Sequence, residues 1–360
     1  MATNLNSRVF GYLDETGSPV EAWTLNGQGG LVLEVITYGG IVTRLLAPDR
    51  DGHLTDVVLG FNNLDSYLAG HPYFGAIIGR VAGRITGAAF SIDGAPFDLA
   101  KNDPPNHLHG GIEGFDKKVW TAIPVSRPDG APSLCLIYYS PAGEEGYPGS
   151  VNVSVTYTVT NDNTFLIETE AVTDRPTPIN LTHHSYFNLA GEAAGCITDH
   201  ELQVSSDEFV TTDKQMALLG RLESVMGRNN DFRQHRRLSD VLPLIFQNHG
   251  DLYLVKTSPP EAGLLNMARV AQLVHPNSGR IVDVSTTEAY VQAYFGAALD
   301  GSLIGKSDVP YKQHAGICLE CHSYPDGVNH PGLGDIIVHP GRPKRQTTAY
   351  AFSTLKRNSA

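Results

Sequence analysis

The chain has 360 residues, with 26 Lys and Arg against 38 Asp and Glu and a formal net charge of −12. A chain of this length can bury a sizeable core, and its negative charge argues against a nucleic-acid or anionic-membrane partner, because binding phosphates needs a positive surface. No run approaches about 18 consecutive apolar residues, and residues 1–7 lack the basic and then apolar stretch of a secretory signal, so we expect a cytoplasmic protein without a membrane segment.

Short segments that alternate apolar and polar residues dominate the chain. In residues 151–160, Val and Tyr alternate with Asn, Ser and Thr, which predicts a strand with one wet face. The predicted strands, separated by Gly, Pro and Asn turns, are residues 31–37, 56–60, 151–160, 164–171, 268–275, 280–286 and 317–321. Residues 63–68 and 261–267 could each form a helical turn or two. These patterns predict an all-β fold, a large antiparallel β-sandwich with few short helices, as one domain over residues 1–360.

The four cysteines are too few for a disulfide scaffold at this length. Cys318 and Cys321 form a CxxC motif, which invites a zinc or redox interpretation. They lie on a predicted strand, however, where residues three apart face opposite sides of the sheet. We therefore expect buried free thiols rather than a metal or redox pair.

Residues 180–189 (NLTHHSYFNL) carry many polar groups for a segment that is expected to be buried. Two imidazoles, two amides and three hydroxyls lie in a segment whose apolar residues suit a buried strand. Buried polar groups are costly unless each has a hydrogen-bond partner. The segment is therefore either a satisfied structural network or a site.

Three further polar segments interrupt the apolar alternation. Residues 79–85 carry Arg80 and Arg84, residues 106–111 carry two histidines, and residues 316–326 carry Glu320 within a strand that is otherwise buried in character. A carboxylate there is expensive unless it is paired or its perturbed pKa is useful. A Glu and His acid/base pair with an Arg for polar recognition suits chemistry on a neutral polyol.

These segments together resemble one family, the aldose 1-epimerases or galactose mutarotases. The stretches that carry the resemblance are residues 38–42, 56–61, 73–85, 108–111, 180–189, 292–294, 319–320 and 325–326. The resemblance runs from about Phe10 to about Ser353. It implies a galactose mutarotase-like supersandwich that acts on a free monosaccharide without a metal or organic cofactor, as a monomer or homodimer.

The resemblance also implies residue roles. The catalytic base falls on Glu320 and the catalytic acid on His184. The residues that match the family's substrate-binding positions are Arg84, His109, Asp251 and Gln292. Glu320 as carboxylate would take the proton of the C1 hydroxyl while His184 as imidazolium protonates the ring oxygen; after rotation about C1–C2, reclosure gives the other anomer. Unperturbed pKa values of about 4.3 for Glu and about 6.5 for His already allow these protonation states over part of the range around pH 5 to 6. Near pH 7 His184 needs an acidic neighbour to stay charged, and the reaction requires no extreme pKa shift.

The chain departs from the family pattern at the rim of the expected site. Gly83 and His183 each stand where Asn is common, and Ala289-Tyr290 stands where Pro-Gly is common. These changes bear on substrate preference more than on reaction type. Arg80 is expected to be structural. The sequence leaves open whether His183 lies in the core or in the site, because adjacent residues on a strand face opposite sides of the sheet.

Three alternatives remain beside an aldohexose epimerase. The spacing of a cupin metal motif is present in His107, His109 and Glu113. Gly110-Gly111 would interrupt the strand that this motif needs. Without a metal role, His107 is expected to be structural or to lie at the edge of the site. A silent sugar-binding module would not need an acid/base pair. A phosphosugar-specific relative would need additional cations for the phosphate.

Overall fold

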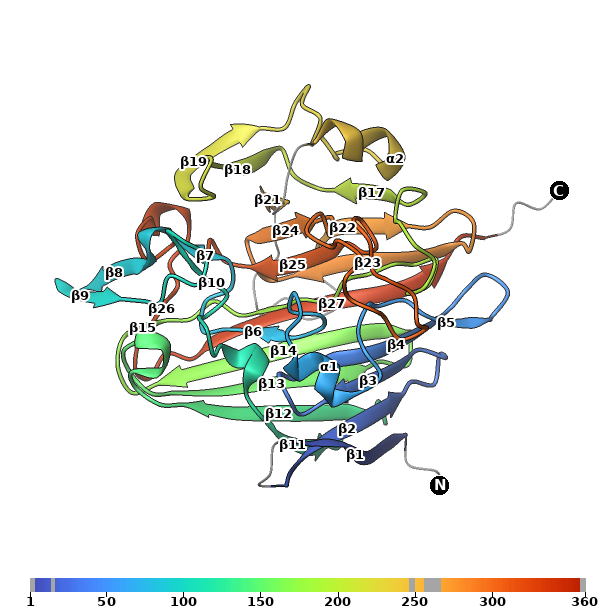
Figure 1. Cartoon of the computed structure of the whole chain (residues 1–360), viewed down its shortest axis with the longest axis horizontal. Coiled ribbons are helices and arrows are strands. Elements are labelled where there is room, and N and C mark those ends of the chain that lie inside the picture. The colour runs from blue at the N-terminus through green and yellow to red at the C-terminus, as the bar shows by residue number, and fades with distance from the viewer. Residues whose placement is uncertain (1–3, 14–16, 246–249, 256–266, 357–360) are drawn as a thin grey trace.

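A nine-stranded antiparallel sheet forms the centre of the molecule, and two five-stranded sheets pack with it (Figure 1). The structure, a computed structural model, describes residues 4–13, 17–245, 250–255 and 267–356. In spatial order, the nine strands are β11 (Thr121–Val125), β12 (Ser133–Ser140), β13 (Val151–Val159), β14 (Thr164–Thr173), β27 (Lys344–Thr354), β23 (Arg280–Thr286), β22 (Arg269–Val274), β17 (Glu201–Val204) and β20 (Arg236–Arg237).

The two five-stranded sheets cover different parts of the central one. The first consists of β1 (Leu5–Leu13), β2 (Ser18–Asn26), β3 (Val32–Ile36), β4 (Val42–Pro48) and β5 (Leu54–Asp56). The second consists of β19 (Leu218–Ser224), β18 (Glu208–Thr212), β21 (Asp251–Leu254), β24 (Tyr290–Tyr294) and β25 (Cys318–His322). Apolar side chains of all three sheets meet in one large core cluster. The predicted all-β sandwich is confirmed.

Short ribbons and helical turns connect the sheets. The ribbons pair β6 (Ile77–Ile78) with β16 (Thr182–His183), β7 (Arg84–Ile85) with β10 (His107–Leu108), β8 (Ala89–Ile92) with β9 (Ala95–Asp98), and β15 (Thr177–Pro178) with β26 (Ile337–Val338). The α-helices within the described ranges are α1 (Leu64–Leu68) and α2 (Leu238–Val241). Asn63 caps α1 by accepting from the Ser66 backbone N–H, as suits a short side chain with an acceptor oxygen. Of the second predicted helical stretch, 261–267, all but residue 267 lie outside the described residues.

The hairpin predicted from period-two alternation is present as β13 and β14. Val151, Val153 and Val155 are buried while Asn152 is exposed. The strands pair from Val151 opposite Thr173 to Val159 opposite Phe165. One buried sheet face imposes this alternation, which is why the pattern predicted the strand.

Two predicted strands are shorter than expected. Of residues 56–60 only Asp56 belongs to a strand, and residues 180–189 pair as a strand only at Thr182–His183. Residues 57–60 and 180–189 are buried, but their backbone groups bond to several different segments: Val57 donates to Leu45, and Leu59 donates to Tyr186. Partners on different elements satisfy the backbone without forming a continuous ladder.

The CxxC cysteines lie on opposite faces of β25, as expected. Both are buried and free. Cys321 packs in the main core cluster, whereas Cys318 belongs to a second cluster. The two sulfurs therefore do not face a common site.

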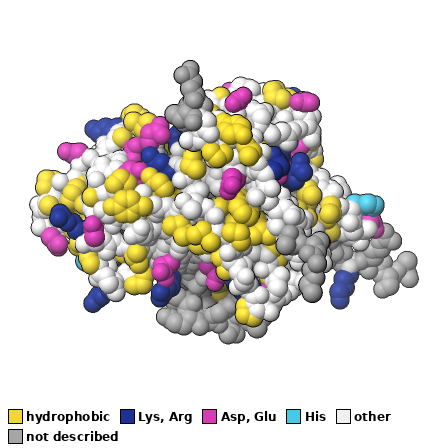
Figure 2. Space-filling view, turned by 90° about the horizontal axis from the view of Figure 1, so that it is seen from below, with side chains coloured by type: hydrophobic (Ala, Val, Ile, Leu, Met, Phe, Trp, Pro, Cys, Tyr) yellow, Lys and Arg dark blue, Asp and Glu magenta, His cyan; other side chains and the backbone are white. Residues whose placement is uncertain are grey.

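Charges of both signs lie side by side on the face of the molecule that Figure 2 shows. This is the side on which β1, β2 and β11 lie in Figure 1. Hydrophobic side chains gather in small groups between the charged ones, and the described side chains of this face form no extended positive surface. Within the residues that the structure describes, no helix is long and apolar enough to cross a membrane.

Candidate active site

Strands β24 and β25 bring Gln292 and Glu320 side by side. The two residues are direct partners in the antiparallel register, so their side chains share one face of the sheet. The other face of β25, with Leu319 and Cys321, packs into the main core. Period two thus directs Cys318, Glu320 and His322 to the face opposite that core.

Residues 180–189 hold His184 above this face. All ten residues are buried, and their polar groups are partnered. The Asn180 amide exchanges two hydrogen bonds of 2.9 Å with the Ser323 backbone, and the Thr182 hydroxyl donates to the Cys321 carbonyl at 3.0 Å. The segment is therefore a satisfied structural network that also carries a site residue, rather than one or the other.

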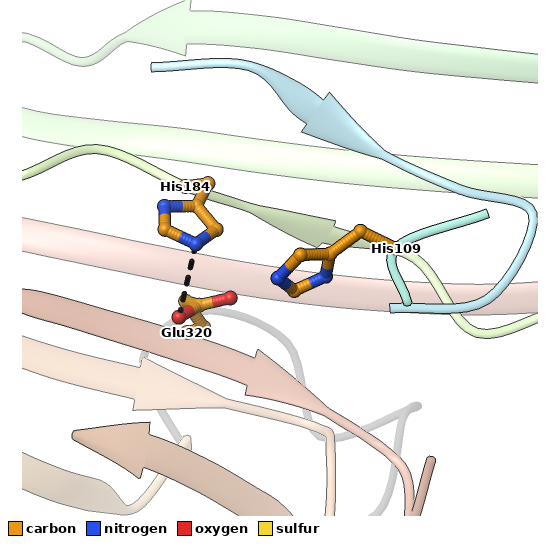
Figure 3. Close-up of side chains that lie close together, drawn as sticks. All are labelled: His109, His184 and Glu320. Carbon is orange, nitrogen blue, oxygen red and sulfur yellow. Dashed lines mark ion pairs between the residues drawn. The ribbon is translucent and has the colours of Figure 1, made fainter. Parts of the chain in front are cut away.

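His184 and Glu320 meet inside the protein. His184 Nε2 lies 3.5 Å from Glu320 Oε1, and the two side chains are only 4% and 3% exposed. On the other side of the ring, Nδ1 lies 3.6 Å from the thiol of Cys318. Figure 3 shows the His184 ring pointing at the carboxyl group and His109 approaching from a separate segment.

His109 is held as a hydrogen-bond donor toward the site. It follows β10 with a positive φ of 52°, and its Nδ1 accepts from the Gly83 backbone N–H at 3.1 Å. Burial lowers the pKa of His109 well below its usual value, so the ring is neutral near pH 7. A neutral imidazole that accepts at Nδ1 carries its proton at Nε2.

The same three side chains are close enough to suggest a cation site. One ligand atom of each of His109, His184 and Glu320 lies within 4.8 Å of the others. A metal ligand must offer a lone pair, however. Nδ1 of His109 already accepts from Gly83 and Nε2 carries the proton, so this donor set does not fit a metal.

The pair opens into a cavity of about 210 Å³. Its lining consists of Pro72, Tyr73, Gly83, Arg84, Leu108, His109, His184, Tyr186, Gln292, Tyr294, Ala298, Glu320 and His322. Five of the six residues expected at the site thus surround one cavity. Arg84 is oriented by Asp103, whose carboxylate accepts from Nε at 2.6 Å.

A larger groove of about 770 Å³ shares Gly83, Arg84 and Gln292 with the cavity, and Asp251 lines this groove. Gly83 lies at the junction with φ of 76°. A Cβ added there would be 2.5 Å from Pro325 Cγ, so the backbone requires glycine at this departure from the family pattern. The four substrate-binding candidates are thus divided, with Asp251 in the groove rather than the cavity.

Burial shifts the pKa values of the central pair in opposite directions. It raises the pKa of Glu320 from 4.5 to about 8 and lowers that of His184 from 6.5 to about 4. These shifts are larger than the reaction was expected to require. The cause is desolvation, which disfavours the charged form of each group.

The two shifts leave one proton on the pair between about pH 4 and about pH 8. The neutral form has the proton on Glu320, and the ionic form has it on His184. Desolvation favours the neutral form, whereas attraction between the two charges at 3.5 Å favours the ionic form. The pair therefore titrates as a unit.

Arg80 and His183 are structural. The Arg80 guanidinium is buried and donates to two hydroxyls and four backbone carbonyls. His183 faces the core, where Nε2 lies 2.7 Å from the Ser185 hydroxyl and Nδ1 lies 3.3 Å from the Tyr157 hydroxyl. Adjacent histidines on an extended segment point in opposite directions, and here only His184 faces the cavity.

The cupin-like arrangement is not present. His107 Nδ1 lies 2.8 Å from the Ala100 carbonyl and Nε2 lies 2.8 Å from the Tyr147 hydroxyl, so both nitrogens have partners within the protein. Glu113 is exposed on the surface. His109 does reach the site, but its backbone is in the left-handed region, so it does not share a strand face with His107.

The cavity contains residues that sequence reasoning missed. Tyr73, Tyr186, Tyr294 and His322 line it, and Cys318 touches His184. For Cys318 and His322 a signal existed, since each lies two residues from Glu320 on a predicted strand. The tyrosines had no comparable signal, because aromatic residues at such positions are equally typical of a core.

Comparisons with known proteins agree on one family. The family model for aldose 1-epimerase matches residues 21–351. Galactose mutarotase of Homo sapiens is 39% identical over 345 residues, which cover 96% of this chain and 97% of that protein. Aldose 1-epimerase of Escherichia coli K12 is 32% identical over 343 residues, covering 93% and 96%.

Solved structures show the same fold. An aldose epimerase homologue from C. elegans superposes with a TM-score of 0.84 at 26% identity, covering 92% of this chain and 98% of that one. Galactose 1-epimerase of Lactobacillus acidophilus superposes with a TM-score of 0.83 at 24% identity, covering 99% and 100%. With a family model spanning most of the sequence and relatives of matching length, the chain belongs to the aldose 1-epimerase family.

Proposed function

We propose that the protein is an aldose 1-epimerase that interconverts the α and β anomers of a free aldohexose such as glucose or galactose. The observation that carries the proposal is the buried pair of His184 and Glu320, 3.5 Å apart at the wall of a cavity. Ring opening of a hemiacetal needs one group to take a proton and another to give one, and a pair sharing a single proton can do both. Relatives named galactose mutarotase and aldose 1-epimerase support this reaction.

In the proposed reaction Glu320 is the base and His184 is the acid. With the proton on His184, the Glu320 carboxylate removes the proton of the C1 hydroxyl as Nε2 of His184 protonates the ring oxygen. The C1–O5 bond breaks and leaves an open aldehyde. After rotation about C1–C2, O5 attacks the other face of the aldehyde, and the two protons return. Proton count and charge on the pair are thereby restored.

Burial serves this chemistry in two ways. A carboxylate whose pKa is raised to about 8 is a stronger base than an ordinary one. An imidazolium whose pKa is lowered to about 4 is a stronger acid. Each group is thus more reactive in its charged form than it would be in water, and the attraction between the two charges keeps that form accessible.

The remaining residues would hold the sugar. Arg84, fixed by Asp103, offers guanidinium N–H groups at the edge of the cavity. His109 offers its Nε2–H, and Gln292 lies beside Glu320 in register. Asp251 in the adjoining groove would accept from hydroxyls at the end of the sugar remote from C1. Holding the sugar in one position adds proximity to the acid/base effect.

Polarimetry tests the proposal. Freshly dissolved α anomers of glucose, galactose, xylose and arabinose are followed to equilibrium with and without the protein. Acceleration of at least one aldose is expected, with galactose and glucose as first candidates. If the protein accelerates none of them above the buffer rate, it is not an epimerase of free aldoses.

A further inference from the structure

A third histidine, His322, lies in the cavity next to the acid/base pair. It is two residues from Glu320 on β25 and therefore on the same face of the strand. Its side chain lines the cavity while the residue is only 2% exposed overall. The reaction described above assigns it no role.

A hydrogen bond within the protein fixes the tautomer of His322. Nδ1 lies 2.7 Å from the Ser323 carbonyl oxygen. A carbonyl oxygen can only accept, so Nδ1 carries the proton and Nε2 keeps its lone pair. Burial lowers the pKa of His322 below its usual value, so the ring stays neutral near pH 7.

His322 thus has the opposite polarity to His109. His109 Nε2 donates because the Gly83 N–H occupies its Nδ1, whereas His322 Nε2 accepts because Nδ1 donates to Ser323. An acceptor in a largely desolvated cavity calls for a ligand that brings a hydrogen-bond donor. On a neutral aldose the available donors are its hydroxyl groups.

The position along β25 indicates which hydroxyls are in reach. Cys318, which contacts His184, lies two residues before Glu320, and His322 lies two residues after it. Residues two apart on a strand are about 7 Å apart. His322 is therefore displaced from the acid/base pair, away from His184, by more than the length of a hydrogen bond.

From this geometry we infer that His322 is a specificity-determining residue whose Nε2 accepts a hydrogen bond from one non-anomeric hydroxyl of the bound aldose. The inference rests on the proposed function and adds a residue to it. A site built to bond a hydroxyl discriminates strongly against an analogue that lacks it, because its own buried group is then left unpaired. Removing one such uncharged bond corresponds to about a tenfold to hundredfold loss in kcat/KM.

The experiment compares the wild type with His322→Phe on glucose and on the four monodeoxy analogues that each lack one non-anomeric hydroxyl. Mutarotation rates are measured by polarimetry, and the ratio of kcat/KM between wild type and variant is taken for each sugar, so that differences in intrinsic reactivity cancel. His322→Gln, whose side-chain oxygen can replace Nε2 as an acceptor, is the conservative variant. His339→Phe, at an exposed histidine after β26, is the matched control.

The expected ratio for His322→Phe is about tenfold to a hundredfold on glucose and close to one on a single deoxy analogue. His322→Gln recovers most of the loss, and His339→Phe behaves as the wild type. A ratio that is equal for all five sugars, or near one for glucose, would overturn the inference, because the loss would then be structural or absent.

A second measurement uses the unaltered protein. The ¹⁵N signals of the histidine rings are followed while glucose is added. The unprotonated Nε2 of His322 should shift on binding and remain unprotonated; an Nε2 signal that does not move at saturating glucose would refute the contact. Wild-type protein that binds glucose but does not accelerate mutarotation would refute the proposed function, whereas the ring shift tests the contact between His322 and the sugar separately.

Discussion

Replacing Glu320 by Gln should make the protein more stable at alkaline pH while it loses activity. In an unfolded chain this carboxyl ionises near 4.5, whereas in the folded protein burial lets the pair of Glu320 and His184 keep one proton up to about pH 8. Between these values the unfolded state binds fewer protons than the folded state. The free energy of unfolding of the wild type therefore falls as the pH rises through this window. Gln cannot ionise, so the Glu320→Gln variant does not lose this stability.

The size of the effect follows from the two pKa values. Raising the pH from 5 to 9 removes about 4 kcal/mol of stability from the wild type that Glu320→Gln retains. For a chain of this length, that corresponds to a change of about 5 °C in the Tm difference between the two proteins. His184 is present in both proteins, so its own titration largely cancels in the comparison.

The assay is thermal unfolding at pH 5, 7 and 9, followed by circular dichroism, for wild type, Glu320→Gln and a control. The exposed Glu168 on β14 provides the control as Glu168→Gln, which should track the wild type at every pH. The Tm of Glu320→Gln should rise relative to the wild type as the pH rises. A Tm difference that is constant from pH 5 to pH 9 would refute the burial argument for this carboxyl.

Three further predictions concern the pair and its surroundings. The pH profile of kcat/KM should be bell-shaped, with limbs near 4 and 8 that belong to the pair, after subtraction of the buffer rate; a profile that still rises at pH 9 would contradict it. Cys318→Ala should lower kcat by up to about tenfold with little change in KM, because His184 loses its partner at Nδ1; a change confined to KM would exclude this positioning role. The two arginines should separate: Arg84→Lys raises KM in steady-state kinetics, whereas Arg80→Lys lowers Tm and leaves KM unchanged, because Arg80 bonds only within the protein interior. A higher KM for Arg80→Lys together with a lower Tm for Arg84→Lys would contradict this assignment.

Much of the fold could be predicted because one buried sheet face leaves a period-two trace in the sequence. The β13 and β14 hairpin was predicted within two residues at either end. The period-two pattern is absent where both faces of a segment are buried, as in residues 57–60 and 180–189. Every side chain there is either apolar or hydrogen-bonded within the protein, so apolar and polar residues do not alternate. Hydrogen-bond partners on distant elements decide such segments, and local sequence does not name them.

Most residues of the candidate site could be predicted from the sequence, whereas the pKa shifts of its acid/base pair could not. Alternation separates His183 from His184, but only packing against Tyr157 and Phe165 shows that His183 takes the core side. The pKa shifts follow from complete burial, which arises when β25 and residues 180–189 close over the pair. His322 was within reach of strand alternation, two residues after Glu320, and its role as an acceptor depends on the bond to Ser323.

The most direct test of the central claim is the mutarotation rate of Glu320→Gln, His184→Asn and the double variant, measured by polarimetry on the best aldose at equal concentrations of folded protein. If the two side chains act as one acid/base unit, each single variant loses about 10²- to 10⁴-fold, and the double variant loses little more than the worse of the two. A near-wild-type rate in either single variant, or losses that multiply in the double variant, would contradict the account.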